Sequence, residues 1–142
     1  MDRVFIDTNV LVDWLTQRRP FADHSTKIIE LVERRLLAGV LNPLVIANTY
    51  YVTATYLDKP TTRNLLTDFT SLFEIVDVSR QHVVNAVEKA SGDFEDEIHV
   101  QTMLANDVKT VITRNSQDFA RASLNAYTPS EYLERLHSTG VL

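Results

Sequence analysis

Short apolar runs alternate with longer segments of helical periodicity along the 142-residue chain. The clearest short runs are Val4–Ile6 and Thr110–Thr113, whose β-branched and aromatic residues are typical of buried strands. Weaker strand candidates are Val40–Leu41, Phe73–Val78 and the region of Ala126–Tyr127. Strands separated by helical stretches predict an α/β fold with a parallel sheet and helices on both faces.

Apolar residues at helical spacing fill the segments between these strands. The expected helices run from Val10 to Arg18, Asp23 to Leu37, Pro43 to Thr55, Pro60 to Phe73, Ser79 to Ala90, Phe94 to Asn106, and onward from Pro129. Gly39 is expected to cap the end of the second helix. No repeat or linker interrupts the pattern, so we expect a single domain over residues 1–142.

Composition excludes several classes of protein. The chain has no cysteine, which rules out a disulfide scaffold, a thiolate metal site and a cysteine nucleophile. The net charge of −5 argues against broad, non-specific nucleic-acid binding. It is compatible with an enzyme that binds phosphate through a metal ion. No apolar run approaches about 20 residues and no signal peptide is evident, so we expect a cytoplasmic protein without membrane association.

Acidic and amide side chains stand where ligands bind in open α/β sheets, at the carboxyl ends of strands. Asp7 and Asn9 follow the first strand, Asn115 and Asp118 follow the Thr110–Thr113 strand, and Asp93 and Asp96 open a helix. Taken singly, Asp7 and Asp93 could be helix caps and Asp118 could stabilise a turn. Taken together, the three segments are better explained by a divalent cation.

Asp96 is the hardest of these residues to explain by structure alone. Positions 93, 96, 100, 103 and 107 fall on one helical stripe, which Val100 and Met103 mark as facing the core, whereas Glu95 and Glu97 lie off it. A buried carboxylate is costly unless it is paired. An ion pair with an arginine such as Arg114 is the structural alternative to a metal.

The donor set favours a hard cation. Oxygen ligands without cysteine point to Mg²⁺ or Mn²⁺. The histidines, which we expect at the surface, are His24, His82, His99 and His137, and no H-x-x-x-H pair exists. The chain also lacks G-x-S-x-G, a Walker loop and G-x-G-x-x-G, which disfavours a serine hydrolase and a glycine-rich nucleotide site.

Three segments in order resemble the PIN domain (PilT N-terminus) family. They are V-F-I-D-T-N-V-L-V-D at Val4–Asp13, D-F-E-D at Asp93–Asp96 and V-I-T-R-N-S-Q-D-F at Val111–Phe119, and the match continues through T-P-S-E-Y-L at Thr128–Leu133. The resemblance implies a three-layer α/β/α sandwich around a central parallel sheet. It also implies an Mg²⁺- or Mn²⁺-dependent endoribonuclease that cleaves single-stranded or structured RNA. Small bacterial members, similar to VapC, are often the toxins of toxin–antitoxin pairs.

Carried over by position, the family assigns roles to residues of this chain. Asp7 and Asp96 match its first and third acids, and Asp118 and Asn115 are rival matches for the fourth. We therefore expect Asp7, Asp96 and Asp118 to be catalytic, and the metal ligands to come from Asp7, Asp93, Asp96, Asn115 and Asp118. Thr8, Asn9 and Thr113 are expected to hydrogen-bond around them, and Arg114, Arg18 and Arg19 to contact RNA. The expected partners are RNA, an antitoxin and a second copy of the chain.

Two positions depart from the family pattern. In Leu44–Tyr51, Asn48 occupies the place of a glutamate, so an oxygen ligand is kept and a charge is lost. Asp93 is the candidate to supply that charge. Glu97 stands where a small residue is commoner.

Two other functions compete with the nuclease. Asn48 favours a PIN fold with a weakened site that is kept as a protein-binding module. A phosphatase of the haloacid-dehalogenase type needs a second aspartate two residues after its nucleophile. Asn9 stands at that position after Asp7, and no lysine lies at the late strand, so this reading is the weakest.

Overall fold

A computed structural model describes residues 1–89, 92–121 and 123–142. Its strands form one sheet in the order β3-β2-β1-β4-β5, and every neighbouring pair is parallel. The strands are β1 (Arg3–Ile6), β2 (Ala38–Leu41), β3 (Glu74–Ile75), β4 (Thr110–Ile112) and β5 (Asn125–Tyr127). From β1 the chain builds outward through β2 and β3, then returns to the other side of β1 to add β4. The strand order therefore reverses between β1 and β4, where α/β sheets open a crevice at their carboxyl ends.

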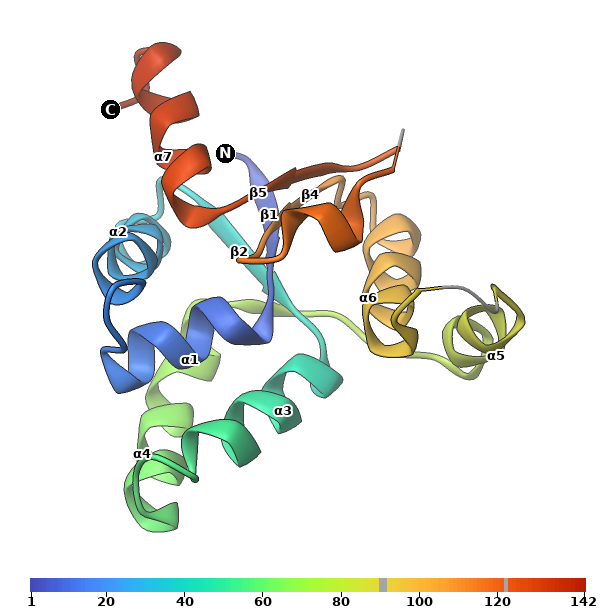
Figure 1. Ribbon diagram of the computed structural model, residues 1–142, viewed down its shortest axis with the longest axis horizontal. Coiled ribbons are helices and arrows are strands. Elements are labelled where there is room, and N and C mark those ends of the chain that lie inside the picture. Colours follow the sequence, from blue (N-terminus) through green and yellow to red (C-terminus); the bar gives the residue numbers. More distant parts are fainter. Residues whose placement is uncertain (90–91, 122) are drawn as a thin grey trace.

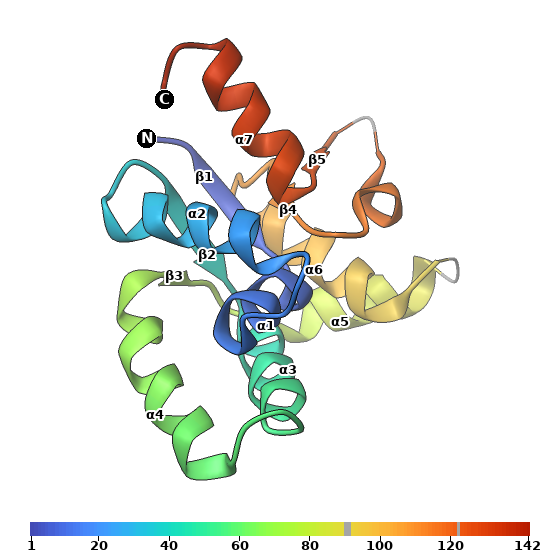
Figure 2. The ribbon, with the colours of Figure 1, turned by 60° about the vertical axis from the view of Figure 1, so that its left-hand side comes forward.

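Helices cover both faces of this sheet. They are α1 (Thr8–Thr16), α2 (Ala22–Glu33), α3 (Pro43–Thr53), α4 (Lys59–Phe69), α5 (Arg80–Lys89), α6 (Phe94–Ala105) and α7 (Pro129–Ser138), with 3₁₀ turns η1 (Thr70–Leu72) and η2 (Ser116–Phe119). Figure 1 shows α1 and α2 on one side of the sheet and α5 and α6 on the other. Figure 2 shows α1, α3 and α4 gathered toward one end of the sheet, the end at which α1 and α3 begin. The expected three-layer α/β/α architecture is confirmed.

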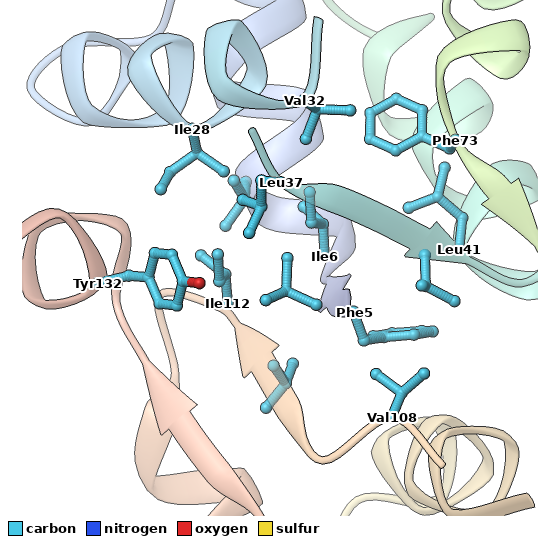
Figure 3. Packing of buried hydrophobic residues seen from close by; sticks show 14 of the residues in the cluster. Phe5, Ile6, Ile28, Val32, Leu37, Leu41, Phe73, Val108, Ile112 and Tyr132 are labelled. Atoms are coloured by element: carbon cyan, nitrogen blue, oxygen red, sulfur yellow. The ribbon is translucent and has the colours of Figure 1, made fainter. Parts of the chain in front are cut away.

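The core is built from side chains that alternate across β1. Phe5 is fully buried and faces α6, with its ring centroid 5.2 Å from that of His99. Ile6 points to the opposite side, where Figure 3 shows Ile28 and Val32 from α2. Side chains therefore cover both faces of β1. This packing holds the strand in place and so positions Asp7, the residue that follows it. No helix in the described part of the chain is long and apolar enough to span a membrane.

The second helix ends earlier than its periodicity predicts. Helix α2 stops at Glu33, because Arg35 adopts a left-handed conformation with φ of 58°. The Leu36 N–H group then donates to the carbonyl of Leu31 at 2.9 Å, which closes the helix in a Schellman-type turn. The prediction that Gly39 caps this helix is wrong. Gly39 lies inside β2, where a Cβ atom would sit 2.5 Å from Cδ1 of Phe73.

Two further boundaries differ from the sequence pattern. Helix α4 ends at Phe69 and continues only as the 3₁₀ turn η1. Strand β3 holds two residues instead of the expected Phe73–Val78, because Phe73 and Val76 pack into the core from beside this edge strand. The expected helix end at Ala90 lies outside the described residues.

Candidate active site

Three segments that are distant in sequence meet at the carboxyl edge of the sheet and line a cleft of about 270 Å³. The cleft contains the acidic residues Asp7, Asp93, Glu95, Asp96 and Asp118, the arginines Arg18 and Arg114, and the polar residues Thr8, Asn9 and Asn115. The acids and amides that the sequence placed at strand ends therefore lie together. Both rival positions, Asn115 and Asp118, line the cleft.

Asp7 is the most firmly held carboxylate of the cleft. It caps the N-terminus of α1, and its Oδ1 accepts a hydrogen bond of 2.8 Å from the Thr8 backbone N–H. Its Oδ2 accepts from the Thr113 hydroxyl at 2.8 Å and from the Asn9 amide at 3.4 Å. The side chain is nearly buried, and these donors fix its direction.

Asp96 lies in the first turn of α6, behind the capping residue Asp93, whose Oδ1 accepts from the Asp96 N–H at 3.0 Å. Burial, followed in size by the negative charges of Asp7 and Asp93, raises the pKa of Asp96 from 3.8 to about 7. Asp96 forms no ion pair within the described residues, because Arg114 is engaged by Asp13 instead. The arginine alternative for Asp96 is therefore wrong, and its charge needs another partner.

His99 corrects the expectation that all four histidines lie at the surface. It is fully buried on α6, one turn after Asp96. Its ring lies beside the cluster, since one ligand atom each of Asp7, Asp96 and His99 lie within 4.8 Å of one another. The predicted helical stripe through positions 93, 96, 100, 103 and 107 does not reach its last member. Helix α6 ends at Ala105, and Asp107 lies beyond it, exposed and with φ of 55°.

The protonation of the His99 ring follows from Asn42. The Asn42 Oδ1 accepts from the Val45 N–H at 2.9 Å, so the amide must point its NH₂ group toward the Nδ1 of His99, 3.0 Å away. A ring nitrogen facing a donor carries no proton, which leaves the proton on Nε2. The Nε2–H group has no hydrogen-bond partner in the described structure. His99 therefore offers a donor to the cluster, and the carboxylates of Asp7 and Asp96 are the groups that fit a cation.

Asn48, at the family's glutamate position, does not itself line the cleft. Its Nδ2 donates a hydrogen bond of 2.6 Å to the Oε1 of Glu95, which does. Asp93, the expected substitute for the missing charge, has its Oδ1 engaged in capping α6. The carboxylate that contacts Asn48 is thus Glu95.

The arginines are placed differently from one another. Arg114 lines the cleft while its Nε lies 2.8 Å from the Oδ2 of the buried Asp13, and its guanidinium carbon lies 4.2 Å from the centre of the Phe21 ring. Burial raises the pKa of Asp13, against the opposing effect of Arg114 and Arg18. Arg18 also lines the cleft, whereas Arg19 is not among its lining residues and pairs with Asp23 at 2.7 Å.

Glu97 has a structural partner outside the cleft. Its buried carboxylate forms an ion pair with Arg121, just after η2, and accepts from the Gln101 amide at 3.1 Å. This pair ties α6 to the segment that carries Asp118. The departure at position 97 is therefore explained by packing rather than by chemistry in the cleft.

Sequence reasoning missed Glu95, His99 and Asn42. The spacing could have pointed to Glu95 and His99. They are four residues apart, and His99 follows Asp96 by three, so Glu95, Asp96 and His99 share a face of α6. Nothing in the sequence pointed to the contact between Asn42 and His99, which joins residues 57 positions apart.

Comparisons with known proteins show which family and fold the chain resembles. The chain is 27% identical over 138 residues to Ribonuclease VapC1 of Aquifex aeolicus (strain VF5), covering 94% of this chain and 95% of that protein. It is similar in structure to VapC20 of Mycobacterium tuberculosis, described as a sarcin-ricin loop cleaving toxin, with a TM-score of 0.69 and 9% identity over 85% of this chain and 96% of that one. It is also similar to VapBC2 of Rickettsia felis bound to a promoter DNA fragment, with a TM-score of 0.65 and 19% identity over 87% of this chain and 96% of that one.

The structural matches have low sequence identity and therefore speak for the fold. The family is shown by sequence. A sequence profile described as PIN domain matches residues 3–117, a span that holds both Asp7 and Asp96. With most of its length matched in this way and its acids gathered at the edge of a β3-β2-β1-β4-β5 sheet, the chain belongs to the PIN domain family.

Proposed function

We propose that this chain is an Mg²⁺- or Mn²⁺-dependent endoribonuclease, formed by a single PIN-like domain over residues 1–142, and that it is the toxin of a toxin–antitoxin pair. The observation that carries the proposal is the approach of the Asp7 and Asp96 carboxylates in a cleft where neither forms an ion pair within the described residues. The name of the relative Ribonuclease VapC1 supports RNA as the substrate.

The residues present fit a hard divalent cation. Oxygens of the Asp7 and Asp96 carboxylates lie within 4.8 Å of one another. Burial, and then the neighbouring acids, raise the pKa of Asp96, so a bound cation would stabilise its ionised form. Asp7 and Asp96 would hold the ion, with Asp93, Glu95, Asn115 and Asp118 around them. When bound, such a cation lowers the pKa of a water molecule and neutralises charge on a phosphodiester.

The protein's own groups prepare the site for RNA. The hydrogen bonds from the Thr8 backbone N–H and the Thr113 hydroxyl hold the Asp7 carboxylate in place at the cleft. Arg18 and Arg114 bring positive charge to the cleft wall, where they would attract the phosphate backbone of the substrate. Asp118 lies on the turn η2 and lines the cleft, and its carboxylate would act on the attacking water or the leaving group.

The proposal is tested by cleavage of a pool of single-stranded and structured RNA by the purified chain. We expect cleavage with Mg²⁺ or Mn²⁺ and none with EDTA. The variants Asp7→Asn and Asp96→Asn should each abolish it, while Asp68→Asn, on α4 and outside the cleft, should cleave like wild type. Thermal melts should also show stabilisation by Mn²⁺ in wild type, about 2.7 kcal/mol at a hundredfold excess over Kd, and none in Asp96→Asn.

A different result would favour the protein-binding module. Wild type that neither gains stability from Mn²⁺ nor cleaves any RNA in the pool would contradict the nuclease. In that case the exposed apolar side chains of Tyr51, Val52 and Tyr56, of which Val52 lines the cleft, would be the candidate surface for binding a protein.

The proposal includes partners. The similar Rickettsia felis and Klebsiella pneumoniae structures are described as VapBC2 and as a toxin–antitoxin complex, which supports an antitoxin partner here. Tyr51, Val52 and Tyr56 expose apolar surface at the end of α3, and Val52 also lines the cleft, so an antitoxin bound there would cover the active site. We also propose that the chain forms a homodimer. We further propose that it acts in the cytoplasm, where its RNA substrate is found. Light scattering of the chain with and without its antitoxin tests the assembly.

A further inference from the structure

Glu95 and Asn48 face each other across the helices α6 and α3. The Asn48 amide donates to the Glu95 Oε1 at 2.6 Å, and the His99 Nε2 lies 3.5 Å from the same oxygen. The Glu95 Oε2 accepts no hydrogen bond among the described residues, and Glu95 lines the cleft with Asp7 and Asp96. One oxygen of Glu95 is thus held by the protein, and the other remains available to a ligand.

The donor beside Glu95 is unusual because it is completely buried. His99 has no exposed surface, and Asn42 keeps its proton on Nε2, where it finds no hydrogen-bond partner in the described residues. Asn42 is itself fixed by Val45 and by the Thr102 hydroxyl, 3.1 Å away. A buried N–H group without a partner is costly, so its direction toward the acidic cluster indicates a group that completes the site when a ligand binds.

The contact between positions 48 and 95 allows only one of them to carry a full charge at low cost. If Asn48 were glutamate, two carboxylates would stand at hydrogen-bond distance, and one would have to take up a proton. An amide at position 48 instead donates to a carboxylate at position 95. A carboxylate on α3 and one on α6 are therefore alternatives that leave the same negative charge at the cleft.

We propose that Glu95, on α6, supplies the carboxylate that this chain lacks at Asn48 on α3, and that the Asn48 amide positions it. This inference rests on the proposed metal-dependent nuclease. It assigns Glu95 to the cation or to a water beside it, and it makes the amide at position 48 a means of holding Glu95 rather than a defect. With Glu95 counted, the cleft has as much negative charge as it would have with a glutamate at position 48.

The first test is Mn²⁺ binding to the purified chain, measured by calorimetry, with RNA cleavage as a second readout. Glu95→Gln keeps the shape of the side chain and can still accept from Asn48, and position 95 is partly exposed, so the variant should fold. We expect it to weaken Mn²⁺ binding by about tenfold or more through the lost charge. Glu30→Gln, on α2 and outside the cleft, is the matched control and should bind like wild type.

The second test is an exchange of the two side chains. The double variant Asn48→Glu with Glu95→Gln returns the carboxylate to α3 and places the amide on α6. We expect it to recover most of the Mn²⁺ affinity and cleavage lost by Glu95→Gln alone. A double variant as weak as Glu95→Gln, with a native melting transition, would overturn the inference.

These measurements separate the inference from the function on which it rests. If Glu95→Gln binds Mn²⁺ like wild type while Asp7→Asn does not, the metal site stands and the role of Glu95 is overturned. If wild type itself binds no Mn²⁺ and cleaves no RNA, the proposed function fails and the inference fails with it.

Discussion

The Thr113 hydroxyl donates a hydrogen bond of 2.8 Å to the Oδ2 of Asp7, although 106 residues separate the two in sequence. The bond exists because β1 and β4 are parallel neighbours in which Ile6 is paired with Ile112. The next residue of each strand, Asp7 and Thr113, therefore emerges at the same level of the sheet edge. The register of the two central strands thus decides where the first acid of the site points.

Replacing Thr113 by valine should weaken the metal site without unfolding the protein. Valine fills the same volume but cannot donate to Asp7, so the carboxylate loses its orienting bond from β4. We expect Mn²⁺ affinity to fall by about 10–100-fold, the usual effect of losing a group that orients a metal ligand. Thr110→Val, on β4 three residues earlier and without a side-chain hydrogen bond in the described structure, is the calorimetric control. Equal affinities for wild type and Thr113→Val would contradict this role.

Stability of the metal-free protein should fall as the pH rises from about 4 to about 7. The pKa of Asp96 is about 7 in the folded chain and 3.8 in its unperturbed state, so across this window the folded chain holds a proton that the unfolded chain has released. Unfolding therefore becomes more favourable with each step in pH until Asp96 is ionised in both states.

Asp96→Asn removes this titration. In EDTA at pH 8 the variant should be more stable than wild type by about 1–2 kcal/mol, less than the whole pKa shift implies because water screens a half-buried charge. At pH 4 the two should be alike. Urea denaturation at both pH values measures the difference, and Asp68→Asn serves as control. A wild type that is not less stable than Asp96→Asn at pH 8 would contradict a raised pKa of Asp96 in the folded chain.

Gly39→Ala should destabilise the fold through a steric clash. A Cβ atom at position 39 would lie 2.5 Å from Cδ1 and 2.7 Å from Cε1 of Phe73, and 3.3 Å from Cγ2 of Val32. Because this ring is buried, we expect a loss of about 1–3 kcal/mol in the free energy of unfolding. The penalty should shrink in a Phe73→Ala background, where the ring is absent. An unchanged penalty there would place the cause elsewhere.

Arg121→Met should cost more stability than its partly exposed position suggests. The substitution leaves the carboxylate of Glu97 buried without its cation, with only the Gln101 amide as partner. We expect a loss of about 2–4 kcal/mol, below the range for a fully buried pair because Arg121 reaches solvent. The double variant Glu97→Gln with Arg121→Met should regain most of it, as chemical denaturation would show. A double variant no more stable than the single one would refute the explanation.

Local periodicity was enough to identify the elements of this protein and their type. The runs at Val4–Ile6 and Thr110–Thr113 and the caps Asp7 and Asp93 depend on neighbours within one turn or one strand, so they can be read along the chain. The acids at strand ends could be placed at one edge for the same reason, since parallel strands share the direction of their carboxyl ends. The ends of α2 and β3 could not be predicted in this way, because α2 ends at the left-handed conformation of Arg35 and Phe73 packs into the core beside β3.

The sequence by itself thus determined an α/β chain with acids at the ends of its strands and the motifs of a PIN domain. Only the tertiary structure decided which strands are neighbours, and so which donors reach Asp7. It also decided that His99 is buried and that Glu95 meets Asn48, a contact across 47 positions. Such contacts are set by how helices α3 and α6 pack against the sheet, and packing depends on the shapes of many side chains at once. A pattern of polar and apolar positions records that a face is buried, but not which side chain it meets there.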